Sequence, residues 1–142
     1  RTRSSTSSYR SSTAWPPRAP NAVATSGVSV RVGSVVIDCN DFSRMSGFWQ
    51  AALGYEPREK PEDDWVVLRD PAGAGVNVSI AKVPEPRLGK NRLHLDLYTQ
   101  DAPAEIERLQ ALGAEVTRTP GPDEDFTVLA DPEGNLFCVI QK

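Results

Sequence analysis

The only histidine of the chain, His94, lies in the run "NRLHLDLY", in which apolar and polar residues alternate. This alternation predicts a β-strand over residues 92–99, and alternate side chains of a strand share a face, so His94, Asp96 and Tyr98 should point the same way. The strand rise puts His94 and Asp96 about 6.5 Å apart at the backbone. An imidazole beside a carboxylate can move a proton near neutral pH. We therefore predict His94 as the candidate general acid or base, aided by Asp96; a hydrogen-bonded structural histidine is the alternative.

A second strand-like run, "SVVIDC" at residues 34–39, places Ser34, Val36 and Asp38 on one face. Carboxylates inside strands are disfavoured unless they are paired. Arg69 and Arg92, each in or beside a predicted strand, are candidate partners for Asp38 and Asp96. The alternative is that these acids recognise a cationic or hydrogen-bond-donating ligand.

Aromatic and sulfur-containing residues add a few candidates. Trp49 falls in a predicted helix and should fill the core. Trp65 opens a predicted strand, where it can rim a pocket and stack against a planar ligand. Cys39 and Cys138 show neither the spacing of a zinc site nor the density of a disulfide framework, so we expect two reduced thiols in a cytoplasmic protein. Cys138 is a candidate nucleophile only if His94 lies within reach.

Composition excludes several kinds of partner. Residues 1–28 are rich in Ser, Arg and Pro and carry four arginines and no acid, which predicts a flexible tail. The chain carries −3 and this segment +4, so the remaining residues 29–142 carry −7. Such an acidic domain argues against nucleic acid, and no apolar run approaches a membrane span. No glycine-rich phosphate loop is present either.

The domain contains two copies of one sequence module. "WVVLRDPAG" at residues 65–73 recurs as "FTVLADPEG" at 126–134, and "ALG" recurs at 52–54 and 111–113. Each copy begins with a strand (34–39, 92–99), followed by Asp41 or Asp101 as a helix cap and a helix that stops at Gly54 or Gly113. Further strands are expected at 54–58, 64–69 and 76–83, and at 114–119, 125–130 and 135–141.

The order βαβββ, repeated, predicts an α+β domain in which a curved mixed sheet encloses a concave cavity and the helices lie outside. The two modules should occupy about residues 31–83 and 91–142. The segment "KVPEPRLGKNR" (82–92) then becomes the linker between them.

These residues resemble the vicinal oxygen chelate superfamily of glyoxalases, bleomycin-resistance proteins and extradiol dioxygenases, and in particular its glyoxalase-like branch. The resemblance is carried by "VVIDCNDFSRMSGFWQAALGYEP", "DWVVLRDPAGAGVNVSIAKVPEP", "KNRLHLDL" and "LADPEGNLFCVI" and covers residues 31–142. It implies a homodimer and a divalent metal on the concave face. The metal ligands should stand on the first and last strands of each module.

Carried over one by one, the metal positions fall on Ser34, Ser79, His94 and Cys138, with Asn77 or Ile80 as alternatives to Ser79. Serine hydroxyls are poor ligands for divalent cations, and one His with one Cys falls short of the three ligands of a catalytic zinc. We therefore expect no metal cofactor. The expected cavity is lined by Ser34, Asp38, Trp65, Ser79, His94, Asp96, Tyr98 and Cys138.

The expected function is the binding of a small organic molecule without a catalytic metal, as in sequestration, resistance or ligand sensing. One alternative is a lyase or isomerase in which His94 is the general acid or base. Another is a divalent-metal-dependent enzyme of the glyoxalase or dioxygenase type. A ligand site should offer a cavity of roughly 300 Å³ or more.

Overall fold

The computed structural model describes residues 30–142, and the predicted flexible tail at 1–28 lies outside the described residues. The first module contains β1 (Ser34–Cys39), α1 (Phe42–Leu53), β2 (Glu56–Pro57), β3 (Trp65–Arg69) and β4 (Asn77–Lys82). The second module contains β5 (Asp96–Thr99), α2 (Ala102–Ala111), β6 (Glu115–Arg118), β7 (Phe126–Ala130) and β8 (Leu136–Gln141). The predicted α+β class and the tandem βαβββ order are both confirmed.

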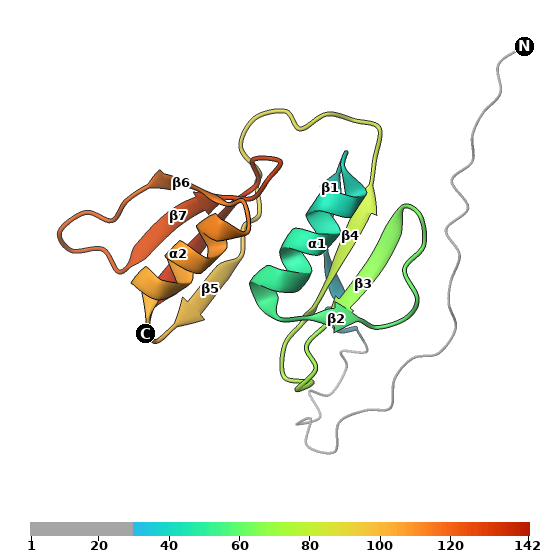
Figure 1. Cartoon of the computed structure of the whole chain (residues 1–142), viewed down its shortest axis with the longest axis horizontal. Coiled ribbons are helices and arrows are strands. Elements are labelled where there is room, and N and C mark those ends of the chain that lie inside the picture. Colours follow the sequence, from blue (N-terminus) through green and yellow to red (C-terminus); the bar gives the residue numbers. More distant parts are fainter. Residues whose placement is uncertain (1–29) are drawn as a thin grey trace, which may run out of the picture. The chain divides into compact units, whose positions relative to one another are not determined.

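Each module forms a four-stranded mixed sheet with its own helix (Figure 1). The strand orders are β1-β4-β3-β2 and β5-β8-β7-β6, so the first strand of each module is an edge strand, paired in parallel with the last. The sequence led us to expect one continuous curved sheet. In the described residues the hydrogen-bonded ladders form two sheets, because β1 and β5 each pair only on one side.

Both helices begin and end with the residues that the repeat predicts. The carboxylate of Asp41 accepts from the amide of Arg44 at 3.0 Å, and that of Asp101 accepts from the amide of Ala104 at 3.1 Å. Gly54 follows α1 with φ 65°, in the left-handed region that favours glycine. The caps therefore fix where each helix starts relative to the strand before it.

The core lies between each helix and one face of its sheet. Trp49, Phe48 and Met45 of α1 are almost fully buried, as are Ile80 of β4 and Phe137 of β8. Trp49 packs edge to face on Phe137 with ring centroids 5.3 Å apart, which joins the two modules through α1. The prediction that Trp49 fills the core is confirmed. No helix among the described residues has both the length and the apolarity to cross a membrane.

The first strand of the second module is shorter than predicted. β5 starts at Asp96, so His94 stands just before the strand and not within it. The side chain of Asn91 explains the difference: its Oδ1 accepts from the amide of Leu136 at 2.8 Å and its Nδ2 donates to the Leu136 carbonyl at 3.1 Å. Asn91 thus takes the ladder bonds with Leu136 that the backbone of residues 93 and 95 would otherwise make.

The predicted pairing of Arg69 with Asp38 or Asp96 is wrong. Arg69 donates to Glu56 on the neighbouring strand β2, at 2.6 Å from Nη2 and 3.1 Å from Nε. Glu56 and Arg69 are directly opposite in the antiparallel β2–β3 register, which brings their side chains together. Asp96 pairs with His94.

Candidate functional site

In each module the two positions that correspond to metal ligands lie beside each other on the open face of the sheet, meaning the face away from the helix. In the first module the two serine hydroxyls, Ser34 Oγ and Ser79 Oγ, lie 2.6 Å apart and share a hydrogen bond. The hydroxyl of Ser34 also donates to the carbonyl of Asn77 at 3.2 Å. Because Ser34 has a single hydroxyl proton, the hydroxyl of Ser79 is then the donor in the bond between the two serines. Because Ser79 is fully buried, this pair is satisfied within its own module.

The strand register distinguishes between the alternatives left open for the first module. Ser79 pairs with Val36, as Cys138 pairs with Asp96. Val36 comes two residues after Ser34, and Asp96 comes two residues after His94. Ser79 therefore corresponds to Cys138, whereas Asn77 and Ile80 do not.

The second module gathers three reactive side chains at the same place. Nε2 of His94 lies 3.1 Å from Oδ1 of Asp96, and their side chains are 50% and 42% exposed. One ligand atom of each of His94, Asp96 and Cys138 falls within 4.8 Å of the others. Burial raises the pKa of the Cys138 thiol, and the charge of Asp96 and a hydrogen bond to it raise this pKa further. The cluster therefore consists of an imidazole, a carboxylate and a protonated thiol.

These donors can be compared with what the family's metal would need. Zinc prefers imidazole, thiolate and carboxylate, and harder cations prefer carboxylate and carbonyl oxygens. Ser34 and Ser79 are weak donors that are already bonded to each other. In the second module the two positions supply one imidazole, His94, and one sulfur, Cys138, which is one ligand short of a catalytic zinc site. The four positions as a set do not fit the family's metal, and no step below passes through one.

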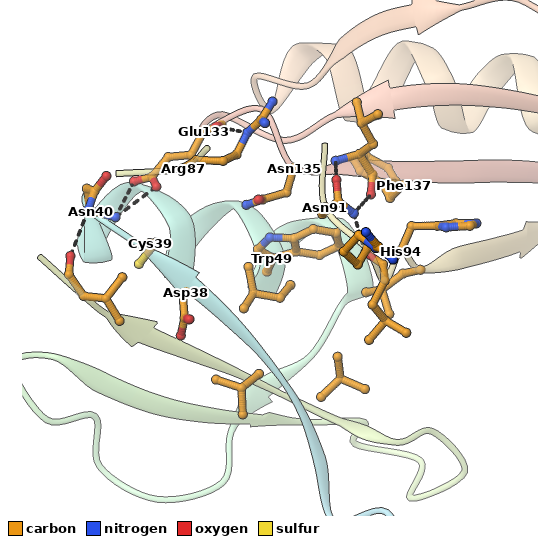
Figure 2. A pocket seen from close by; sticks show the side chains of 18 of the residues that line it. Asp38, Cys39, Asn40, Trp49, Arg87, Asn91, His94, Glu133, Asn135 and Phe137 are labelled. Atoms are coloured by element: carbon orange, nitrogen blue, oxygen red, sulfur yellow. Dashed lines mark hydrogen bonds between the residues drawn. The ribbon is translucent and has the colours of Figure 1, made fainter. Parts of the chain in front are cut away.

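A cavity of about 500 Å³ lies between β1 and the segments that flank β5 and β8 (Figure 2). Trp49 and Phe137 are its aromatic lining residues, and Asp38 and His94 both reach it. Its volume exceeds the roughly 300 Å³ expected of a ligand site. The lining comprises Val35, Val36, Ile37, Asp38, Cys39, Asn40, Trp49, Val83, Glu85, Pro86, Arg87, Asn91, Arg92, Leu93, His94, Leu95, Glu133, Asn135, Leu136 and Phe137.

Among the residues predicted to line one cavity, the structure brings only Asp38 and His94 to this one. Asp96 and Tyr98 line a second hollow of about 580 Å³ between β5, α2 and the end of α1. The remaining four predicted residues line neither of these two cavities: Ser34, Trp65, Ser79 and Cys138. The face of β1 that carries Ser34 does reach the cavity further along the strand, through Val36 and Asp38.

Sequence reasoning missed the walls that come from irregular segments. The sequence predicted a linker at 82–92, a strand at 92–99, a turn at 131–134 and a strand at 135–141. The linker supplies Arg87 and Asn91 to the cavity, and the "DPEG" turn supplies Glu133 and, one residue further, Asn135. One signal was available, since "DPEG" differs from its repeat "DPAG" at Glu133 alone.

Glu133 closes one end of the cavity by binding the start of α1. Its carboxylate accepts from the amide of Asn40 at 3.0 and 2.9 Å and from the amide of Asp41 at 2.6 Å. Backbone amides ahead of a helix carry partial positive charge, which an anionic side chain stabilises. The side chain of Asn40 then donates to the carbonyls of Val83 and Glu85, which ties the linker to the same corner.

Two further contacts hold α1 against the second module. The indole N–H of Trp49 donates to the buried carboxylate of Asp131 at 3.2 Å. At the other end of α1, Arg108 of α2 donates to the carbonyls of Ala51 and Ala52 at 2.9 and 2.7 Å. A cation suits a helix C-terminus as an anion suits its N-terminus. The second module thus holds α1 at its start, middle and end.

Neither thiol is poised for nucleophilic attack. Cys39 is buried at the cavity wall, and burial, followed by the nearby carboxylates of Glu133, Asp41, Asp38 and Asp131, raises its pKa to about 11. The raised pKa of Cys138 has the same consequence, although His94 lies within reach. The thiolate is the nucleophile, so both groups are in the unreactive form near neutral pH. Neither cysteine forms a disulfide.

Comparison with solved structures places this architecture in a known class. A glyoxalase/bleomycin resistance protein/dioxygenase family enzyme from Burkholderia phytofirmans aligns with a TM-score of 0.67 and 18% identity, covering 79% of this chain and 98% of that one. The fosfomycin resistance protein FosX from Listeria monocytogenes, solved with Mn(II) and dihydroxypropylphosphonic acid, aligns with a TM-score of 0.63 and 18% identity over 80% and 90%. A glyoxalase I variant from Zea mays aligns at 0.60 and 21% identity over 79% and 44%. These alignments show that the chain has the fold of these proteins, and at such low identities they show the fold alone.

The sequence itself defines the family. A family model described as "Glyoxalase-like domain" matches residues 34–140, well over half of the chain, and the protein therefore belongs to the glyoxalase-like domain family. The resemblance inferred from the repeat is confirmed. No curated protein matches the sequence.

Proposed function

We propose that this glyoxalase-like protein binds a small organic molecule without the help of a catalytic metal, as a protein of the sequestering, resistance or ligand-sensing type. The observation that carries the proposal is the hydrogen bond of 2.6 Å between Ser34 and Ser79. Half of the positions that would hold a metal are hydroxyls that satisfy each other. The fold retains a cavity of ligand size beside them.

The cavity has the mixed character of a ligand site. Aliphatic and aromatic side chains form much of its wall, and polar or charged residues, among them Asp38 and His94, make up nearly half of its lining. Sites for small molecules are mostly apolar with a few placed polar groups that fix orientation. Two unpaired cysteines are in keeping with a cytoplasmic location, which is part of the proposal.

A compound library screened against cavity variants tests this proposal. Leu136→Trp places an indole at the cavity wall, and Ile140→Trp makes the same change four residues along β8, on the same sheet face but away from the cavity. Binding of true cavity ligands should be lost in Leu136→Trp and retained in Ile140→Trp, with both variants folded by circular dichroism. A screen that finds no ligand sensitive to Leu136→Trp contradicts the proposal.

A proton-transfer enzyme is the second candidate, and the contact between His94 Nε2 and Asp96 Oδ1 at 3.1 Å favours it. If Nε2 donates to Asp96, Nδ1 is the basic nitrogen of the neutral imidazole and can accept a proton from a bound organic acid or ketone. Such a lyase or isomerase would lose about 100-fold or more in turnover when His94 is replaced by Ala. Turnover of a cavity ligand that survives His94→Ala excludes this mechanism.

We also propose that the protein acts as a homodimer. Val36, Leu93 and Tyr98 are 49%, 70% and 67% exposed. Exposed large apolar side chains are candidates for contact with another subunit. Light scattering coupled to size exclusion should give twice the mass of the chain, and a monomeric mass at micromolar concentration would contradict the proposal.

A further inference from the structure

Asp38 is the polar group of the cavity that most needs an explanation. Its exposed side chain lies at the cavity wall beside β1 (Figure 2). No hydrogen bond or ion pair from residues 30–142 reaches its carboxylate. Three of the other acids that sequence reasoning placed in strands, Glu56, Asp96 and Asp125, have side-chain partners. The oxygens of the exposed Asp38 carboxylate are open to hydrogen bonds from a bound ligand.

The side-chain amides and the indole N–H that line the cavity already donate hydrogen bonds to other groups of the protein. Nδ2 of Asn40 donates to two linker carbonyls, and Nδ2 of Asn91 donates to the carbonyls of Leu93 and Leu136. Nδ2 of Asn135 and the indole N–H of Trp49 both donate to Asp131. These contacts also fix the orientation of each amide, because only the nitrogen end can donate. A ligand must therefore bring its own donors to Asp38.

Three acids (Asp38, Glu85 and Glu133) and two arginines (Arg87 and Arg92) line the cavity, so its lining carries a net charge of −1. The carboxylate of Glu133 already accepts from the backbone amides ahead of α1. Arg87 donates to the carbonyls of Glu133 and Gly89, so its charge is directed at the backbone. Arg92 also lines the cavity, but it makes no ion pair with Asp38. The net charge of −7 on residues 29–142 further favours the approach of cations.

The rest of the wall is apolar and rigid. Trp49 and Phe137 are each 1% exposed and pack edge to face, so they form a fixed surface. Leu93 and Val36 expose apolar area nearby. A flat apolar body fits such a wall better than a chain of polar groups does.

Resting on the proposed function, we infer that the ligand of this cavity is an amphipathic organic cation, with a flat apolar body against the wall around Trp49 and Phe137. Its ammonium or amidinium group donates to Asp38. The charge-assisted hydrogen bond gives the ligand its orientation, while the apolar contacts give most of its affinity.

Three probes that share one body test the inference: 2-naphthylmethylammonium, 2-naphthylmethanol and 2-naphthoate. Calorimetry is carried out on the full chain, on Asp38→Asn and on the control Asp63→Asn, which removes one acid from an exposed loop residue that lines no cavity. The wild type and Asp63→Asn should bind the cation about 5-fold more tightly than the alcohol, as an exposed charge pair allows. Asp38→Asn should abolish that preference.

Several outcomes overturn the inference. One is a preference for the cation that persists in Asp38→Asn. Another is tightest binding of the naphthoate, which would make Arg92 the recognition residue and should then disappear in Arg92→Gln. Failure of the cation to bind overturns the inference whatever else binds. The proposed function falls only if, in addition, no library compound loses binding in Leu136→Trp.

Discussion

Corresponding positions of the two modules hold different chemistry on the same backbone. Ser79 of the first module and Cys138 of the second occupy one register position, and Ser34 and His94 occupy another. In the first module the pair is two hydroxyls bonded to each other, with Ser79 fully buried. In the second the pair is joined by Asp96, and the side chains of His94 and Asp96 are 50% and 42% exposed. The first module thus places two hydroxyls at these positions, whereas the second places an imidazole and a thiol beside a carboxylate.

The turns before the last strands differ in the same way. Asp70 and Asp131 each accept a hydrogen bond from the amide two residues on, at 2.8 and 3.0 Å, so both turns are built alike. The residue that donates is Ala72 in one and Glu133 in the other. Only Glu133 reaches the start of the other module's helix. The two copies thus share the aspartate that builds each turn. They differ at the residue that, in the second copy alone, joins the modules.

The largest expected difference concerns the two helices. Trp49 and Leu109 occupy the same position of the repeat and are each 1% exposed. Trp49→Ala should lower the free energy of unfolding by about 4 kcal/mol, and Leu109→Ala by about 3 kcal/mol. Trp49 costs more because it also bonds Asp131 and packs on Phe137 across the modules. Urea denaturation measures both, and an equal or larger loss for Leu109→Ala would contradict this account of how the modules are joined.

The turn residues give the next effect. Glu133→Ala should cost about 1–2 kcal/mol, because it removes an anionic acceptor from the start of α1. Ala72→Glu, the reciprocal change, should alter stability by less than about 0.5 kcal/mol. Glu133→Gln should lie between, since it keeps an acceptor without the charge. A loss for Ala72→Glu as large as that for Glu133→Ala would show that the difference between the turns has no structural role.

Double-mutant cycles compare the two site pairs directly. Ser34→Ala with Ser79→Ala should show a coupling of about 1 kcal/mol, because a buried hydrogen bond is lost. His94→Ala with Asp96→Ala should couple by about 0.5 kcal/mol, since the pair is exposed. Added salt should weaken the second coupling and leave the first unchanged. A larger coupling for His94 and Asp96 than for Ser34 and Ser79 would contradict the conclusion that the serine pair is shielded from solvent and the His94–Asp96 pair is exposed.

A pH dependence above neutrality belongs to the first module. The pKa of Cys39 is raised from 9.0 to about 11 in the folded chain, so between these values the unfolded chain releases the proton first. Stability is therefore unaffected below pH 9 and falls as the pH rises from 9 to 11. At pH 9.5 the loss should stay under about 1 kcal/mol relative to pH 8. Cys39→Ala should remove this part of the decline, and an identical decline in the variant would contradict the assignment.

The fold could be predicted because its determinants are local. These determinants are the alternating strands, the helix caps at Asp41 and Asp101, and the two "DP" turns, and each acts within a few residues. Each of them occurs in both copies of the repeat. The largest error in a boundary, at the start of β5, depends on Asn91, whose side chain replaces ladder bonds of Leu136 45 residues away. No local pattern encodes that replacement.

The site was predictable only in part, for the same reason. His94 and Asp96 could be paired from the spacing of a strand, and Cys138 from its place in the repeat. The cavity walls at Arg87 and Glu133 arise where the linker and a turn meet the other module. Such contacts depend on how the two modules pack, which the pattern of either one does not specify.

Metal binding tests the central claim most directly. The full chain, purified without chelator, is assayed for metal content and titrated by calorimetry with Ni²⁺, Zn²⁺, Mn²⁺ and Fe²⁺, beside His94→Ala. The bonded serines of the first module predict no stoichiometric binding in either protein. One equivalent of metal bound by the wild type and lost in His94→Ala would contradict the claim, and would make His94, Asp96 and Cys138 the core of a metal site.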